Sequence, residues 1–274
     1  MNKKIYTLLF VAATLLTFSC EQKVKTSEEH VVEGESFVED DEFLNYENAN
    51  KMQEIESRLS SFMVIHSLVW EKHNYENNSE LTQVQAYLNE DGELVKIVEQ
   101  FIGGNYAPQG DRHYYLENNE VIGYQEYLDV WVDTLQNNYV ENRTVYENGE
   151  AVFSQTRTAI TYDEIHNVDW SKQEANTISI DKVMRLLNGT GEFETHFISI
   201  INANSLFLLL GEAKEDINNR YTTAVRVDEM TPFIEDLLTH REEYKFRPVN
   251  IKFNVVGGQG EPEFRVLTDI SWKN

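Results

Sequence analysis

Alternating apolar and polar residues, interrupted by short turn sequences, dominate the middle of the chain. Three segments share this pattern around a tight turn: Tyr87–Val95, Tyr115–Ile122 and Val145–Val152. Asp-Gly and Asn-Gly at the turn centres supply the positive φ angles that tight hairpins need, and Asn-Asn tolerates them. Since a period of two places successive side chains on opposite faces of a strand, the pattern predicts six antiparallel strands in a meander.

A helical pattern precedes the meander. Positions 52, 55, 59, 62, 66 and 69 carry apolar residues or His66 and recur at spacings of three and four. This spacing predicts a helix over residues 43–71 with one face against the sheet. The fold class expected is therefore α+β, an N-terminal helix packed on an antiparallel β-meander. For His66 we favour a partly buried core histidine, with a ligand or a catalytic base as the alternative.

A second pattern follows a polar stretch over residues 166–176. The elements it predicts are helix 180–187, strands 192–200, 205–210 and 221–227, a helix from Thr231 to about Tyr244, and strands 249–256 and 263–272. Thr231 and Pro232 are typical of a helix N-terminus. We therefore divide the chain into a hairpin-repeat domain over 43–165, a linker over 166–176 and a β-β-β-α-β-β domain over 177–274.

That element order resembles the OB-fold, a five-stranded Greek-key barrel with a helix between its third and fourth strands. Two segments carry the resemblance: Phe207–Gly211, an apolar strand that ends in glycine, and Val266–Ile270, the closing strand. The resemblance implies an OB-like domain similar to those of some bacterial envelope lipoproteins. A non-barrel α+β sandwich stays open as an alternative, because residues 200–205 contain no clear glycine-bearing bend.

The first twenty residues have the features of an export signal. Two lysines precede an apolar run from Ile5 to Phe18, which is shorter than the ~20 apolar residues of a transmembrane helix. We expect a signal peptide over residues 1–19. Cys20 follows at once and is the single cysteine of the sequence.

The segment Leu16–Cys20 resembles the lipobox of bacterial lipoproteins, with Thr17 where the motif has leucine. The resemblance implies that Cys20 is acylated and that the membrane is a partner through this anchor. The expected location is the bacterial cell envelope, at the outer membrane. An ordinary secreted protein with a chance cysteine is the alternative. Residues 20–42, rich in Asp and Glu, are then a lipidated acidic tether.

Charge and composition narrow the classes of partner. The chain has 23 Lys and Arg against 47 Asp and Glu, and its net charge is −24. An aromatic content of 12% is too high for a disordered chain. Residues 177–274 carry a net charge of −4 and residues 20–176 a net charge of −22. Nucleic-acid binding draws on phosphate neutralisation, so we expect no nucleic-acid partner.

Familiar hydrolase, zinc-binding and phosphate-binding motifs are absent from the sequence. It contains no Gly-x-Ser-x-Gly, no His-Glu-x-x-His and no phosphate-binding glycine loop, and its seven histidines lack metal-ligand spacing. We expect no cofactor, no metal and no catalytic residue. The function expected is a non-catalytic, lipid-anchored envelope protein that binds a protein, peptide or glycan through its sheet surfaces. The alternative is an envelope hydrolase that uses a pair of carboxylates.

Candidate ligand-binding residues are aromatic or basic and lie in the OB-like segment: Phe207, Tyr221, Arg226, Arg247 and Lys252. The meander is also rich in tyrosine, at positions 87, 114, 115, 124, 127, 139 and 146. Tyrosine is a good β-former, which explains these positions without a function. The alternative is a recognition surface, because tyrosine combines a large contact area with a polar tip.

Overall fold

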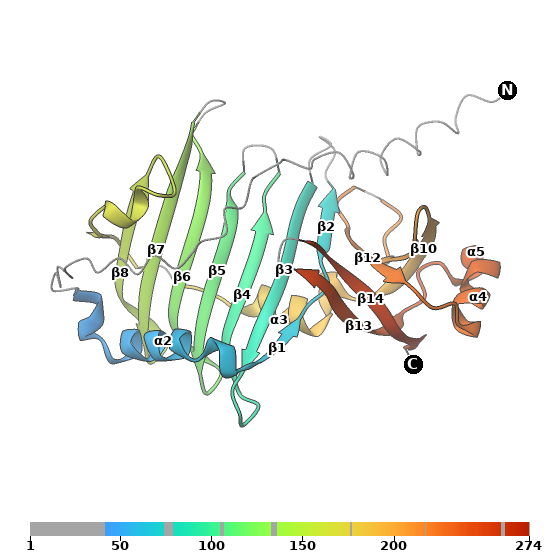
Figure 1. Ribbon diagram of the computed structural model, residues 1–274, viewed down its shortest axis with the longest axis horizontal. Coiled ribbons are helices and arrows are strands. Elements are labelled where there is room, and N and C mark those ends of the chain that lie inside the picture. The colour runs from blue at the N-terminus through green and yellow to red at the C-terminus, as the bar shows by residue number, and fades with distance from the viewer. Residues whose placement is uncertain are drawn as a thin grey trace. The chain divides into compact units, whose positions relative to one another are not determined.

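The computed structural model describes residues 42–73, 79–104, 107–132, 136–175, 177–216, 218–258 and 261–273 (Figure 1). Its strands belong to one sheet in which antiparallel pairing prevails. The prediction of an antiparallel, β-rich fold is confirmed at that level. The predicted signal peptide, Cys20 and the tether up to residue 41 lie outside the described residues.

The elements before the meander are short. They are η1 (Glu42–Asn45), α2 (Glu47–Ser57), η2 (Leu59–Ser61), β1 (Met63–His66) and β2 (Trp70–His73). The helix predicted over residues 43–71 is therefore wrong beyond Ser57. The chain there pairs twice with one strand of the meander, Ile65 opposite Ala86 and Trp70 opposite Thr82. Pairing with β3 satisfies the backbone N–H and C=O groups of this segment. Its β-branched residues favour a strand, so the pairing outweighs the helical spacing of the apolar residues.

The meander has the three predicted hairpins. Its strands are β3 (Ser79–Leu88), β4 (Leu94–Ile102), β5 (Gln109–Glu117), β6 (Glu120–Trp131), β7 (Asn137–Glu147) and β8 (Glu150–Ala159). Gly92, the Asn118-Asn119 pair and the Asn148-Gly149 pair have positive φ at the three turns. The three hairpins are confirmed, with each turn at the residues that the sequence indicated.

Helices pack on opposite faces of the meander (Figure 1). On one face, Ala49 and Met52 of α2 are buried against Tyr115, Val145 and other core residues. Gly123 permits this approach, because a Cβ at that position would lie 2.1 Å from Sδ of Met52.

On the other face lies α3 (Asp181–Asn188), whose Val183 and Leu186 are buried in a core with Trp70 and Ile97. The helix ends at Gly189, which has a left-handed φ of 60°. The short helix predicted at this place is confirmed.

The C-terminal segment follows the predicted element order. Its elements are η4 (Gly191–Phe193), β10 (His196–Asn202), β11 (Leu206–Gly211), β12 (Tyr221–Val227), α4 (Pro232–Thr239), α5 (Arg241–Tyr244), β13 (Val249–Gly258) and β14 (Glu261–Trp272). β10, β11 and β12 pair antiparallel in that order, and β14 pairs antiparallel with β13 and parallel with β12. A further antiparallel bridge joins His196 to Pro248, just before β13.

β12 also connects this segment to the meander. Its residues Tyr221 and Thr222 pair with Lys72 and Glu71 of β2, so the sheet runs without a break from β10 to β9 (Ser171–Lys172). One core contains buried residues from both sides of this junction, and residues 41–274 form one compact unit. The domain boundaries drawn from the sequence stay a prediction about which parts fold independently.

Candidate functional site

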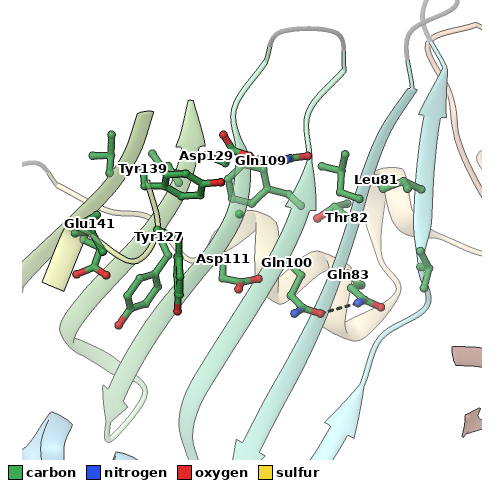
Figure 2. A pocket seen from close by; sticks show the side chains of 18 residues that line it. Leu81, Thr82, Gln83, Gln100, Gln109, Asp111, Tyr127, Asp129, Tyr139 and Glu141 are labelled. Atoms are coloured by element: carbon green, nitrogen blue, oxygen red, sulfur yellow. Dashed lines mark hydrogen bonds between the residues drawn. The ribbon is translucent and has the colours of Figure 1, made fainter. Parts of the chain in front are cut away.

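A groove of about 490 Å³ lies on the α2 face of the meander, toward the end of the strands opposite to the end that α2 crosses (Figure 1 and Figure 2). Two rows of side chains, each running across β3, β4, β5, β6 and β7, form its surface. The first row is Gln83, Gln100, Asp111, Tyr127 and Glu141, and the second is Leu81, Ile102, Gln109, Asp129 and Tyr139. Its volume lies within the range of about 300–1,000 Å³ that is typical of small-molecule sites.

The strand register explains why these residues meet. In each row every residue is the direct cross-strand partner of the next, as Gln100 is of Asp111 and Asp111 is of Tyr127. Directly opposed residues on one face have Cβ atoms only about 4.5–5.5 Å apart. Residues that are 58 positions apart in the sequence, Gln83 and Glu141, thereby belong to one continuous strip.

A chain of hydrogen bonds orders the first row. The guanidinium of Arg265 in β14 donates to Oε1 of Gln83 (2.8 Å), and Nε2 of Gln83 donates to Oε1 of Gln100 (2.7 Å; Figure 2). Gln100 in turn hydrogen-bonds to the carboxyl of Asp111. Because a guanidinium only donates, both amides have a fixed orientation, with their NH₂ groups toward Asp111.

Two of the carboxyl groups in the groove, those of Asp111 and Asp129, lie on the neighbouring strands β5 and β6. Burial raises the pKa of Asp111, and the hydrogen bond from Gln100 partly opposes that rise. Oδ2 of Asp129 accepts a hydrogen bond from Nε2 of Gln109 (2.9 Å). Its Oδ1 is buried and has no hydrogen-bond partner among the described residues. A buried acceptor without a donor favours a ligand that brings one.

One wall of the groove comes from the loop between β8 and β9. Tyr162 and Ile165 of this loop line the groove, and the ring of Tyr162 meets that of Tyr139 edge-on at 6.0 Å. Trp170 holds the loop on the sheet, since the guanidinium groups of Arg143 and Arg157 lie 4.0 and 4.4 Å from its ring.

The charge of the groove is one-sided. Among the described residues that line it, three are carboxylic acids and none is Lys or Arg. Glu141 is paired with Arg157, a residue outside the lining, whose Nε lies 2.7 Å from the Glu141 carboxylate. An anionic ligand would meet no cation on this surface.

A buried polar cluster separates the groove from α2. Lys96 is 2% exposed and its ammonium bonds to the carboxylate of Glu56, which also accepts from the hydroxyl of Tyr115. The hydroxyl oxygen of Tyr115 lies 2.7 Å from Oε1 of Gln125, and this amide oxygen accepts a hydrogen bond from the hydroxyl of Tyr127 in the groove. Burial lowers the pKa of Lys96, an effect that Glu56 partly offsets.

His113 shares the same face and is largely enclosed. Burial, assisted by the nearby Lys96 charge, lowers the pKa of His113 to about 4. The imidazole is therefore neutral at pH 7, and its Nδ1 has no hydrogen-bond partner in the described part of the chain. We assign it no chemistry.

The structure brings together two of the five ligand residues expected from the sequence. Phe207 and Arg226 are direct partners across β11 and β12, beside a depression of about 280 Å³ that Phe207 and Phe264 line. Arg226 is bound to Asp228 (2.7 and 2.9 Å) and lies 5.1 Å from the ring of Phe264.

The other three expected residues lie apart. Tyr221 packs against Phe193 in the core, five positions from Arg226 and so on the opposite face of β12. Arg247 stacks 4.0 Å from the ring of Trp272. Lys252 forms an exposed ion pair with Asp269 at 3.0 Å.

His66 is half-buried at the end of β1, with Nδ1 buried and unbonded within the described residues. Its pKa is lowered by burial and by the positive charge of Arg265. No set of His, Cys, Asp or Glu in the ranges described is grouped to hold a metal ion. No helix in those ranges has the length and apolarity needed to cross a membrane.

Of the residues that line this groove, the sequence singled out only two of the three tyrosines. Tyr127 and Tyr139 belong to the meander tyrosines considered as a recognition surface, whereas Tyr114, Tyr115 and Tyr124 are core residues. No family model, no curated protein and no solved structure matches the chain.

Proposed function

We propose that this chain is a lipid-anchored protein of the bacterial envelope that binds a ligand in the groove and performs no chemistry on it. One observation carries the proposal. The groove unites tyrosine rings, fixed amides and carboxyl groups on one face of a rigid sheet, which is the composition of a specific small-molecule site.

The anchor in this proposal rests on the sequence. A short apolar leader ends at the single cysteine, Cys20, in a segment that resembles a lipobox. Acylation would hold the chain at the outer membrane. Replacement of Cys20 by serine should move the protein from the membrane fraction to the soluble fraction. Unchanged partition, together with no acyl label on the wild type, would contradict it.

The C-terminal segment is, in this proposal, an OB-like module. Two features support it. The strands pair in the order β10-β11-β12-β14-β13. The bridge from His196 to Pro248 then connects the last strand of this order back to the first. The connection between the parallel strands β12 and β14 contains α4, α5 and β13. The module supplies Arg265, which is not among the lining residues but holds Gln83, the first residue of the hydrogen-bonded row.

Binding in the groove has a direct test. The purified full chain is mixed with neutral trisaccharides, anionic oligogalacturonate or trilysine, and saturation-transfer NMR reports which of them binds. Tyr162→Ala should abolish the signal, because Tyr162 is a wall of the groove and is 61% exposed, so its loss leaves the core intact. Ile160→Ala is the matched control, 63% exposed on the same loop and outside the lining. Equal signals in both variants would refute the groove as the site.

A second candidate is hydrolysis by a carboxyl pair. Asp111 and Asp129 favour it, because they are diagonal neighbours on β5 and β6 in one groove. Such neighbours have Cα atoms about 7–8 Å apart, and the carboxyl pairs of glycosidases are separated by about 5–9.5 Å. Burial raises the pKa of Asp111, as a general acid requires. Release of reducing ends from the trisaccharides, lost in Asp111→Asn with binding retained, would establish this candidate over the first.

A further inference from the structure

We infer that the ligand of the groove is an uncharged saccharide, whose ring face lies against the tyrosine wall and whose hydroxyls bond to the amide and carboxyl row. This inference rests on the proposed function and specifies the chemical class of the ligand. Three properties of the groove lead to it, namely its charge, its hydrogen-bonding capacity and its aromatic rings.

The charge of the groove lining argues against an anionic ligand and, to a lesser degree, against a cationic ligand. The lining has no Lys or Arg among its described residues. Each of its carboxyl groups already has a partner from the protein: Asp111 bonds to Gln100, Asp129 to Gln109 and Glu141 to Arg157. A site built for a cation would leave carboxylates free to neutralise it. A neutral ligand fits this arrangement.

The hydrogen-bonding capacity matches hydroxyl groups. An amide offers two N–H donors and a carbonyl acceptor, and the orientation of Gln83 and Gln100 is set by Arg265. Each amide uses one N–H within the row, which leaves a second N–H for a ligand oxygen. The unbonded Oδ1 of Asp129 supplies a strong acceptor. A sugar hydroxyl donates one hydrogen bond and accepts others, so it satisfies both kinds of group at once.

The rings supply the apolar part of the contact. Tyr127 and Tyr139 lie on the side of the groove opposite Leu81 (Figure 2), and Tyr162, whose ring meets that of Tyr139, also lines the groove. The flat C–H face of a pyranose packs on an aromatic ring, whose face is the negative side of its quadrupole. A peptide that bound as an added strand would need a row of unpaired strand N–H and C=O groups, which the paired strands of this sheet do not offer.

The trisaccharide panel tests this inference with two variants. We expect at least one of maltotriose, cellotriose, xylotriose and laminaritriose to bind the full chain, while oligogalacturonate and trilysine do not. Gln100→Leu, which breaks the row between Gln83 and Asp111, should weaken binding about tenfold, equivalent to ~1.4 kcal/mol. Gln85→Leu is the control, since Gln85 is on the same face of β3 outside the lining. Melting temperatures of both variants establish that they fold.

Each outcome has one meaning. Trisaccharide binding that Gln100→Leu weakens and Gln85→Leu leaves intact supports the inference. Binding of trilysine or oligogalacturonate alone, lost in Tyr162→Ala, overturns the saccharide and leaves the groove as a ligand site. Absence of binding to every compound overturns the saccharide and the proposed function together.

Discussion

The buried pair of Lys96 and Glu56 predicts an asymmetric response to substitution. Lys96 is 2% exposed on its side chain and Glu56 is 39% exposed, so loss of the carboxylate strands a cation in the core, whereas loss of the cation leaves a carboxylate in reach of water. Removal of one partner of a fully buried pair costs ~3–5 kcal/mol, and replacement by an apolar residue of similar size is often neutral. Because Glu56 is partly exposed, its removal should cost less than this range for a fully buried pair.

We therefore expect Glu56→Gln to lower the free energy of unfolding by about 2–3 kcal/mol and Lys96→Met to change it by less than about 1 kcal/mol. The amide of the first variant still accepts from Tyr115, so the loss reports the charge. The double variant should be as stable as Lys96→Met alone, a coupling of about 2 kcal/mol in a double-mutant cycle. Urea unfolding followed by tryptophan fluorescence measures all four proteins.

The lowered pKa of Lys96 adds a dependence on pH. Between the folded pKa of Lys96 and the ordinary value of 10.5, the unfolded chain binds more protons than the folded one. Stability of the wild type should therefore rise with pH in this window relative to Lys96→Met, which lacks the group. The exposed pair of Lys51 and Glu117 (2.9 Å) is the control, where either substitution should cost less than about 1 kcal/mol. Equal losses in Glu56→Gln and Lys96→Met, or parallel pH profiles, would refute the reasoning.

Three further predictions follow from the same packing. Gly110→Ala should lower the melting temperature strongly, by calorimetry, because its Cβ would lie 1.9 Å from the backbone oxygen of Tyr127; a small change would show that β5 and β6 can separate. His66→Leu should keep or raise stability at pH 7, and it should reduce the loss of stability below the ordinary pKa of 6.5, since the lowered pKa makes the unfolded chain bind more protons there; a loss of ligand binding with retained fold would make His66 a site residue. The full chain should unfold in one transition, and residues 177–274 alone should not unfold cooperatively, because their core residues pack on the meander; a stable isolated fragment in denaturant titrations would support the boundary drawn from the sequence.

Local features of the fold could be predicted from the sequence. Hairpin turns such as Asn148-Gly149 and the helix stop at Gly189 depend on residues a few positions apart, and both are where the sequence indicated. The extent of the first helix could not be predicted. His66 leaves the helical pattern because it pairs with Gln85 of β3, a contact between distant segments that no local spacing encodes.

The groove could not be predicted because it depends on register. Gln83 and Gln100 are ordinary polar positions of alternating strands, and only the pairing of β3, β4 and β5 places them in a row with Asp111. A shift of one residue in any strand would turn that strand's contribution to the other face. Tyr162 is still less predictable, since it comes from a loop that Trp170 fixes on the sheet.

The pairing of β2 with β12 has a consequence for the order in which the chain acquires its structure. Thr222 bonds to a backbone oxygen of Glu71, 151 positions earlier, whereas each meander hairpin joins neighbouring segments. Local hairpins close fast and distant pairings late, because loop closure costs entropy before contacts compensate for it. The meander should thus form first with the edge of β2 open, and an open strand edge is a template for aggregation. Any chain that stops before β12 leaves that edge of β2 without its partner, so the last fifth of the sequence protects the edge of the meander from intermolecular pairing.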